Sequence, residues 1–252
     1  MIPDDDRGLL LGDGLFETIL AVDGELVLFD EHFERMARGC EVLGIPVPDG
    51  RQARRQAEQA MTGMEDGRIA VRLTLTAGQG RGLERPVAVT PRLIATASPS
   101  PLPIGPARLI QVVIRRNPTS PASRLKTLAY LDNVLARAEA RAAGADEALM
   151  LNTRGEVACA AAANLFWISD GRLVTPALSC GILAGIARGQ ILAAAVEIGV
   201  GVSEAVVQPD ALEAVEGMFL TNSLMGVREV SELDGRPIPS SALTAELSSR
   251  CR

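Results

Sequence analysis

One lysine stands out among the residues that could do chemistry. The chain has 252 residues and 25 basic side chains, of which Lys126 is the only lysine and the others are arginines. An arginine guanidinium stays protonated and cannot act as a Schiff-base amine, whereas a lysine amine can. Because this chain uses arginine almost everywhere for a cation, Lys126 is a candidate nucleophile. The alternative is that a single lysine has been kept by chance.

A phenol follows Lys126 in the chain. Tyr130 is the only tyrosine and lies four residues later. If both residues belong to the predicted helix, this spacing brings their side chains to one face. The Tyr130 hydroxyl could then donate a hydrogen bond to a ligand that Lys126 holds. The alternative is that Tyr130 packs in a helix interface and keeps its hydroxyl at the rim.

Two segments of the C-terminal half could bind a phosphate. Residues 185–187, Gly-Ile-Ala, open a predicted helix, and a helix start presents unpaired N–H groups and the positive end of the helix dipole. Thr221 and Ser223 end an apolar strand, where hydroxyls could make a second contact. The ordinary alternatives are a loop-to-helix junction and a solvated turn.

A glycine-rich loop spans residues 78–82, but its context argues against nucleotide binding. The loop joins two predicted strands and does not open a helix, as a dinucleotide-binding loop would. Its Arg81 is instead a candidate for binding the carboxylate of a substrate.

Composition disfavours several other classes of protein. The net charge of −6 and the 3% aromatic content argue against nucleic-acid binding. The apolar stretch 173–202 contains Arg188 and Glu197, so we expect no membrane span there. His32 is the only histidine. A multi-histidine metal site is therefore impossible, and a Ser-His-Asp triad would have to use His32.

The cysteines and the N-terminus favour a reducing compartment. The four cysteines include no C-x-x-C pair, and their spacing suggests neither a zinc site nor a disulfide framework. No basic segment followed by an apolar core opens the chain, so we predict no signal peptide. Both observations predict a cytoplasmic protein.

The elements that must position these residues begin with a small α+β domain over residues 1–100. Its expected strands are 17–22, 25–29, 68–77 and 86–97, and its expected helices are 31–44, with Asp30 as the N-cap, and 51–61. The segment 98–106 contains four prolines, so we place a linker at 101–106.

A larger C-terminal domain is expected over residues 107–252, and it carries Lys126. Its expected strands are 108–114, 146–152, 155–160, 163–169, 171–176, 201–207 and 217–223, and its expected helices are 128–144, 185–199 and 210–216. A turn region and a polar tail are expected after the last strand.

Seven blocks of the chain occur in the order found in a known family. They are residues 12–19, 31–36, 116–136, 145–152, 162–167, 181–188 and 219–227. Together they resemble the class IV aminotransferases, the fold-type-IV pyridoxal-phosphate enzymes, over nearly the whole chain. The resemblance implies a two-domain α+β fold with a small α/β sandwich domain and a larger domain that contains a pseudo-barrel.

The resemblance also implies roles for particular residues. Lys126 would hold pyridoxal 5′-phosphate as a Schiff base and shuttle protons. The cofactor-binding residues would be Arg35, Ser223 and the N–H groups of Ile186 and Ala187 at the phosphate, Leu183 at the ring face, Tyr130 at the phenolate oxygen and Cys159 near the ring nitrogen. The family is usually homodimeric, with loops of the partner subunit closing the site.

Cys159 is the main departure from the family pattern. It occupies the position five residues before Asn164, where the family usually has a glutamate that keeps the ring nitrogen protonated. A neutral thiol would do this poorly, which weakens the ring as an electron sink. Glu156 is a poor substitute, because on a strand it should point to the opposite face.

A second departure concerns the substrate. Ala77 stands where lyase-like sequences often carry an arginine, which shifts recognition of a carboxylate to Arg81, Arg115 or Arg116. Ala187 replaces the usual threonine, which removes a hydroxyl but keeps the N–H group.

Two blocks indicate the type of reaction. Residues 116–140 and 219–227 look most like those of aminodeoxychorismate lyases, which convert 4-amino-4-deoxychorismate to 4-aminobenzoate and pyruvate in folate biosynthesis. Our hypothesis is that a weak electron sink disfavours transamination but harms this lyase reaction less, because formation of an aromatic ring drives it. The alternatives are an aminotransferase of branched-chain or D-amino acids, a cofactor-binding homologue without turnover, and a non-enzymatic interaction module.

Overall fold

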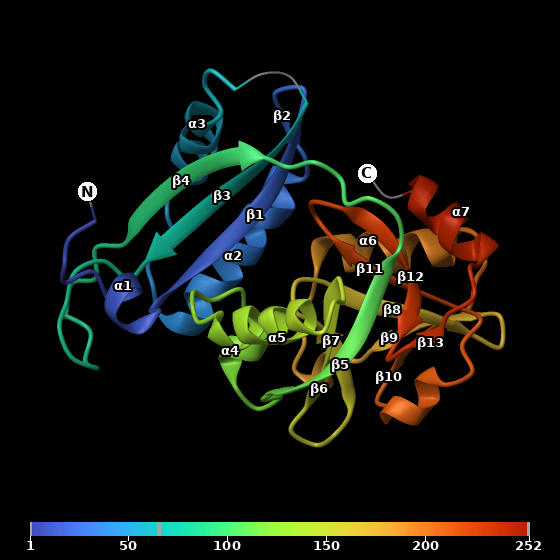
Figure 1. The fold of residues 1–252 in the computed structure, drawn as a ribbon. Helices are drawn as coiled ribbons and strands as arrows, with labels where there is room; N and C mark the ends of the chain where they lie inside the picture. The colour runs from blue at the N-terminus through green and yellow to red at the C-terminus, as the bar shows by residue number, and fades with distance from the viewer. Residues whose placement is uncertain (1, 65–66, 251–252) are drawn as a thin grey trace. The chain divides into compact units, whose positions relative to one another are not determined.

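The computed structural model describes residues 2–64 and 67–250, which divide into two compact units (Figure 1). The N-terminal unit contains residues 1–102 and 125–129, and the C-terminal unit contains residues 103–124 and 130–252. The fold class is α+β, as predicted.

A four-stranded antiparallel sheet forms the N-terminal unit, with strand order β2-β1-β3-β4. Its strands are β1 (Gly14–Val22), β2 (Glu25–Leu26), β3 (Arg68–Thr76) and β4 (Arg92–Pro99), and its helices are α1 (Arg7–Leu11), α2 (Phe29–Leu43) and α3 (Gly50–Ala60). Helices α2 and α3 cover one face of the sheet (Figure 1). Alternate apolar residues of β1 and β3 point into this layer and make the core with Phe29, Met36 and Ala53.

The segment 125–129 extends this sheet. Strand β2 pairs only with Ala21 and Val22 at the end of β1, which leaves the beginning of β1 available on that edge. There the Phe16 N–H donates to the Lys126 carbonyl oxygen at 2.8 Å, and the Leu128 N–H donates to the Gly14 carbonyl oxygen at 3.0 Å. We had placed Lys126 in the C-terminal domain, but these bonds tie its segment to the N-terminal unit.

The C-terminal unit is built on a curled sheet with strand order β10-β9-β8-β11-β12-β5-β6-β7. Strand β7 contacts β8 and β9 as well as β6, so the sheet curls into the pseudo-barrel that the resemblance implies. Its interior is apolar and includes Leu149, Leu165 and Trp167. The strands are β5 (Ala107–Arg116), β6 (Glu147–Asn152), β7 (Val157–Ala160), β8 (Asn164–Ser169), β9 (Arg172–Pro176), β10 (Val202–Ala205), β11 (Gly217–Asn222), β12 (Gly226–Leu233) and β13 (Arg236–Pro237), which pairs with β12.

Helices pack on the outside of the curled sheet (Figure 1). Helix α5 (Leu131–Ala142) lies on β5 and β6, whereas α6 (Ile186–Glu197) and α7 (Ala242–Arg250) contact β11 and each other. A short helix α4 (Pro121–Arg124) and two 3-10 turns, Leu178–Cys180 and Pro209–Leu212, complete the unit. Among the described residues, no helix combines the length and the hydropathy that crossing a membrane requires.

Several local predictions were wrong. Helix α2 begins at Phe29 after Leu28, whose left-handed backbone makes no side-chain cap, so Asp30 lies in the first turn and is not the N-cap. Residues 86–91 are not a strand, because β4 begins only at Arg92. The polar tail folds as α7, where Thr244 and Leu247 are buried.

The helix predicted over residues 128–144 is present as α5, but it begins only at Leu131. Tyr130 is the N-cap residue of α5, and Lys126 lies before it in the extended segment. The spacing of four residues therefore does not place the side chains of Lys126 and Tyr130 on one helical face, because both residues precede the first residue of α5.

Candidate functional site

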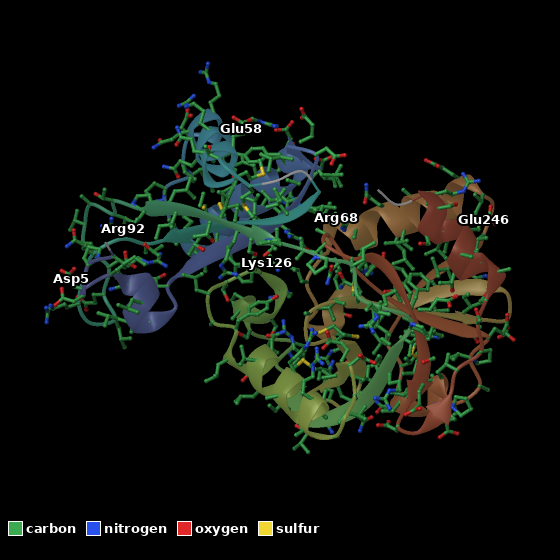
Figure 2. The ribbon with its side chains drawn as sticks, turned by 45° about the horizontal axis from the view of Figure 1, so that its top comes forward. Asp5, Glu58, Arg68, Arg92, Lys126 and Glu246 are labelled. Atoms are coloured by element: carbon green, nitrogen blue, oxygen red, sulfur yellow. The ribbon has the colours of Figure 1, made fainter. Side chains whose placement is uncertain are left out.

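Lys126 has the chemistry of a reactive amine. Lys126 lies on the segment that runs beside β1 (Figure 2). Its Nζ atom lies 4.3 Å from the centroid of the Phe16 ring. Burial lowers the pKa of Lys126 from 10.5 to about 8; the charge of Glu17 opposes this, while those of Arg35 and Arg72 add to it. At pH 7 about a tenth of the amine is therefore unprotonated and nucleophilic, far more than for a lysine with the usual pKa.

A buried carboxylate lies in the middle of β1. The side chain of Glu17 is 1% exposed and accepts hydrogen bonds from Arg35 Nε at 2.8 Å and from Arg35 Nη2 at 2.6 Å. His32 Nδ1 lies 2.7 Å from the second Glu17 oxygen. Burial raises the pKa of Glu17, but the bonds from Arg35 and His32 outweigh it and leave this pKa below its usual range. Glu17 is thus an ionised carboxylate between two residues of α2.

The beginning of α6 has a shape suited to an anion. The N-cap Gly185 is in an extended conformation, and no side chain caps the helix. Asn164 of β8 donates from Nδ2 to the Leu183 carbonyl oxygen at 2.9 Å and fixes the loop before the helix. A Cβ on Gly185 would lie 2.1 Å from Asn164 Oδ1, so only glycine fits here. Ile186 and Ala187 are the first two helical residues, and their N–H groups point out of the helix start.

Polar residues follow β11 in the same unit. Ser223 is half-buried in the turn after this strand, where Asn222 Oδ1 accepts from the N–H groups of Leu224 and Met225. Thr221 stands opposite Asn164 in the pairing of β11 with β8. The Thr221 hydroxyl is buried and has no hydrogen-bond partner among the described residues, which marks a polar position that the protein's own groups do not satisfy.

Cys159 is a neutral thiol. It lies in β7 and is buried. Burial raises the pKa of Cys159; the nearby Arg116 opposes this and Glu147 adds to it. Glu147 accepts hydrogen bonds from Arg137 and from the Ala148 N–H at 2.6 and 3.0 Å. Glu147, the carboxylate that acts on this thiol, is therefore already engaged and does not replace the glutamate usual at position 159.

Two other residues mentioned in the sequence analysis are also engaged. Glu156 accepts from Arg154 Nη2 at 2.7 Å and from Asn152 Nδ2 at 2.6 Å. Arg116 is buried and donates to the Ser123 carbonyl oxygen at 2.5 Å and to Asn133 Oδ1 at 3.1 Å. These bonds make Arg116 a support of the loop before Lys126 and argue against its role in binding a substrate carboxylate.

The remaining predicted residues lie in different parts of the fold. Arg81 is exposed on the loop between β3 and β4, and Arg115 of β5 donates from Nη1 to the Val112 carbonyl oxygen at 2.6 Å. Lys126, Arg35 and Arg81 belong to the N-terminal unit, whereas the other predicted residues belong to the C-terminal unit, namely Tyr130, Cys159, Leu183, Ile186, Ala187, Ser223 and Arg115. In the N-terminal unit the charge of Arg35 acts on the Lys126 amine. In the C-terminal unit Leu183 lies in the loop just before Ile186 and Ala187, which begin α6.

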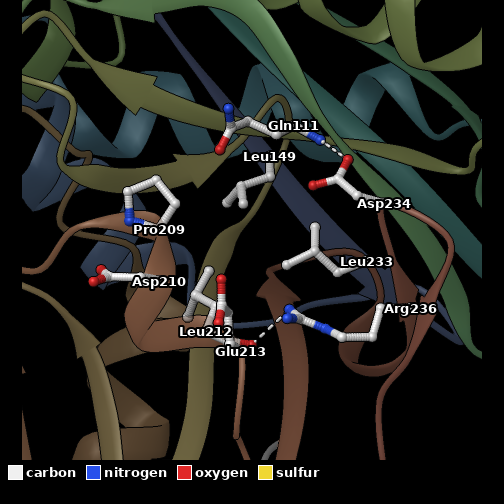
Figure 3. A pocket seen from close by; sticks show the side chains of 9 residues that line it. All are labelled: Gln111, Leu149, Pro209, Asp210, Leu212, Glu213, Leu233, Asp234 and Arg236. Atoms are coloured by element: carbon white, nitrogen blue, oxygen red, sulfur yellow. Dashed lines mark hydrogen bonds between the residues drawn. The ribbon is translucent and has the colours of Figure 1, made fainter.

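A small cavity of about 210 Å³ in the C-terminal unit contains none of the predicted residues (Figure 3). Two of its polar side chains make hydrogen bonds to the backbone around it. Asp234 accepts from the Gln111 N–H at 2.8 Å, and Arg236 Nη2 donates to the Leu212 carbonyl oxygen at 2.8 Å. The cavity is therefore not part of the candidate site.

Four residues that support the candidate site are not among the predicted site residues, namely Glu17, His32, Asn133 and Asn164. Glu17 had a visible signal, since it is the one charged residue of the mostly apolar segment 15–20. A charge in a strand that is buried on both faces needs partners, and the only histidine and an arginine follow on the next helix. The two asparagines had no comparable signal, because their bonds join segments distant in the sequence.

The chain is similar to known enzymes of one family over most of its length. Residues 14–233 match the family model described as amino-transferase class IV. A Methanocaldococcus jannaschii protein, named provisionally as a branched-chain-amino-acid aminotransferase, is 34% identical over 92% of this chain and 83% of its own length. The aminodeoxychorismate lyase of Bacillus subtilis is 28% identical over 91% of this chain and 80% of its own length.

A solved structure is similar in both sequence and fold. The crystal structure of 4-amino-4-deoxychorismate lyase from Pseudomonas aeruginosa is 35% identical and has a TM-score of 0.89, covering 99% of this chain and 93% of that chain. The likeness therefore extends over both compact units.

Proposed function

Because the chain belongs to the amino-transferase class IV family, whose members are pyridoxal-phosphate-dependent enzymes, we propose that it is a lyase that converts 4-amino-4-deoxychorismate to 4-aminobenzoate and pyruvate. Both lyases and branched-chain aminotransferases are similar to it. The choice between these reactions is the part that we propose.

The residues of the chain fit the cofactor that the family uses. Lys126 is a partly buried amine with a pKa of about 8, which suits attachment of an aldehyde. The uncapped start of α6 and the unpaired Thr221 hydroxyl are polar positions that the protein leaves unsatisfied, and both suit a phosphate. When bound, pyridoxal phosphate supplies an aldehyde that captures the substrate amine and a ring that accepts electrons.

In this proposal each predicted residue has its own task. Lys126 binds the cofactor aldehyde and moves a proton to and from the substrate at its Nζ atom. Arg35, Ser223 and the N–H groups of Ile186 and Ala187 bind the phosphate, and Leu183 packs on the ring. Tyr130 donates its hydroxyl to the phenolate oxygen. Arg81 and Arg115 are the candidates for binding the substrate carboxylates.

The single observation that carries the choice of a lyase is the buried, neutral Cys159 beside Arg116. Glu147, which acts on the Cys159 thiol, and Glu156, three residues away, are each hydrogen-bonded to an arginine. Transamination depends on a strong electron sink at every turnover. The lyase reaction gains the stability of an aromatic product, so it depends less on how strongly the cofactor ring accepts electrons.

One observation favours an aminotransferase as the second candidate. The M. jannaschii relative covers 92% of this chain at 34% identity, so the second candidate is an aminotransferase that acts on branched-chain or D-amino acids. For the assembly we propose a cytoplasmic homodimer, which size-exclusion chromatography with light scattering would test.

The two reactions are separated by their products. The purified, cofactor-loaded protein is mixed with 4-amino-4-deoxychorismate, and 4-aminobenzoate is followed by fluorescence. In parallel, valine or D-alanine is supplied with 2-oxoglutarate and the new amino acid is measured. A lyase gives 4-aminobenzoate and little amino transfer. The variant Lys126→Ala should abolish the formation of 4-aminobenzoate.

Two outcomes would contradict the proposed lyase. Rapid amino transfer without 4-aminobenzoate would identify an aminotransferase, and bound cofactor with neither product would indicate a homologue without turnover. The variant Cys159→Glu restores the usual carboxylate and serves as an internal comparison. It should raise the rate of the amino-transfer half-reaction relative to the lyase reaction, because a protonated ring is the stronger electron sink.

A further inference from the structure

The carboxylate of Glu17 is the centre of a charged cluster inside the N-terminal unit. It is 1% exposed and receives three hydrogen bonds, two from Arg35 and one from His32. A carboxylate accepts only, so the His32 Nδ1 atom carries the shared proton. A charge this deeply buried is tolerated only where partners compensate its lost hydration. All three side chains are therefore held in one arrangement.

This arrangement fixes the direction of Arg35. Its Nε and Nη2 atoms engage the two oxygens of Glu17 side by side, and such a paired contact defines the plane of the guanidinium as well as its position. His32 and Arg35 are three residues apart on α2, so both face β1. The Arg35 side chain is 12% exposed, and moving it would leave Glu17 without its main partner.

The same carboxylate acts on Lys126. The charges that act most strongly on the Lys126 amine are those of Glu17 from β1, Arg35 from α2 and Arg72 from β3. Glu17 is the only one of these that favours the protonated amine. The backbone holds this relation, because the Phe16 N–H, next to Glu17, donates to the Lys126 carbonyl oxygen.

We propose that Glu17 is a positioning residue that fixes the orientation of Arg35 and supplies a buried negative charge that favours the protonated form of the Lys126 amine. The part that concerns Arg35 rests on the proposed function, in which Arg35 binds the cofactor phosphate. The part that concerns Lys126 does not, because it can be measured on the chain without cofactor.

The Lys126 part is tested by the pH dependence of amine labelling. Acetic anhydride labels Lys126 and the α-amino group, which peptide mass spectrometry distinguishes because Lys126 is the only lysine. In the wild type the labelling midpoint should lie near the pKa of about 8. Glu17→Gln should lower it, and a drop of one unit raises the unprotonated fraction at pH 7 about fivefold. An unchanged or higher midpoint overturns this part.

The matched control is Asp13→Asn. Asp13 is a 13% exposed carboxylate of the same unit that pairs with Arg7 and Arg85. Its replacement removes the same charge from the protein without touching the cluster around Glu17. The Lys126 midpoint should stay at its wild-type value in this control. An equal drop in both variants would show a general effect of net charge and overturn the assignment to Glu17.

The Arg35 part is tested with Glu17→Asp, which keeps the charge but is too short to hold both nitrogens of Arg35 in the same place. Its labelling midpoint should stay near the wild-type value. The readout is the ratio of affinities for pyridoxal 5′-phosphate and pyridoxal, which isolates the phosphate contact. This ratio should fall about tenfold, as expected for a strained charge-assisted contact.

The outcomes remain distinct if a variant does not fold or if the proposed function fails. Should Glu17→Gln not fold, the Glu17→Asp ratio still decides, and an unchanged ratio overturns the positioning of Arg35. Should the wild type show no preference for the phosphorylated aldehyde, the proposed function fails together with the Arg35 part. The labelling midpoints then still decide the Lys126 part.

Discussion

Replacing Lys126 with methionine should stabilise the cofactor-free protein at neutral pH. The pKa of this amine is lowered from 10.5 to about 8, mainly by burial. At about 1.36 kcal/mol for each pKa unit, the folded state disfavours the protonated amine by up to about 3 kcal/mol. Methionine has a similar length and carries no charge, so it removes this penalty while filling the same space over the Phe16 ring.

The sign of the pH dependence follows from where the proton is bound. Below about pH 8 the amine is protonated in both the folded and the unfolded chain, so the full penalty acts on the wild type. Between about pH 8 and 10.5 the unfolded chain binds more protons than the folded chain, and the stability of the wild type rises with pH. The advantage of Lys126→Met should therefore shrink over this range and vanish above it.

The assay is urea unfolding of both cofactor-free proteins at a series of pH values, from which the free energies of unfolding are obtained. Other titrating groups are the same in both proteins and cancel in the difference. The control is Lys126→Arg, which stays protonated throughout and should become progressively less stable than the wild type as the pH rises. A difference between the wild type and Lys126→Met that does not change with pH would refute the reasoning.

Three further variants or treatments test the C-terminal unit. Gly185→Ala places a methyl group 2.1 Å from Asn164 Oδ1. This variant should lower the free energy of unfolding by about 1–3 kcal/mol and weaken cofactor binding. Unchanged thermal stability and cofactor affinity would contradict the close approach. Asn133→Ala removes one of the acceptors of buried Arg116 and should lower the free energy of unfolding by about 1–3 kcal/mol, which urea titration measures. Cys159 should resist iodoacetamide in the folded protein near pH 7.5, because burial raises the pKa of its thiol. If peptide mapping finds Cys159 alkylated as fast as in urea, the thiol is not buried and neutral.

Much of the fold follows from local patterns in the sequence. Alternating apolar residues and turn signals at Asp23-Gly24 and Asp170-Gly171 predict the strands around them, and these turns have the positive φ angles that such residues adopt. The predictions failed where an element depends on distant contacts. Helix α7 carries few apolar residues and is stabilised by burying Leu247 against the layer around α6.

The candidate site was predictable in part. Lys126 is visible from composition alone, because it is the only lysine. Its setting is not, since the segment that carries it pairs with β1, more than 100 residues earlier in the chain. Nor could the sequence show that Glu147 and Glu156 are engaged elsewhere. That fact, on which the interpretation of Cys159 depends, follows from side-chain partners brought together by folding.

The most direct test of the account is reduction of the cofactor-loaded wild type with borohydride, followed by mass spectrometry of its peptides. The account predicts one modified residue, Lys126, whose peptide gains the mass of the reduced pyridoxyl phosphate, with loss of the visible absorbance of the protein. A protein that stays colourless in the presence of cofactor, or a reduced sample in which Lys126 is unmodified, would contradict the central claim.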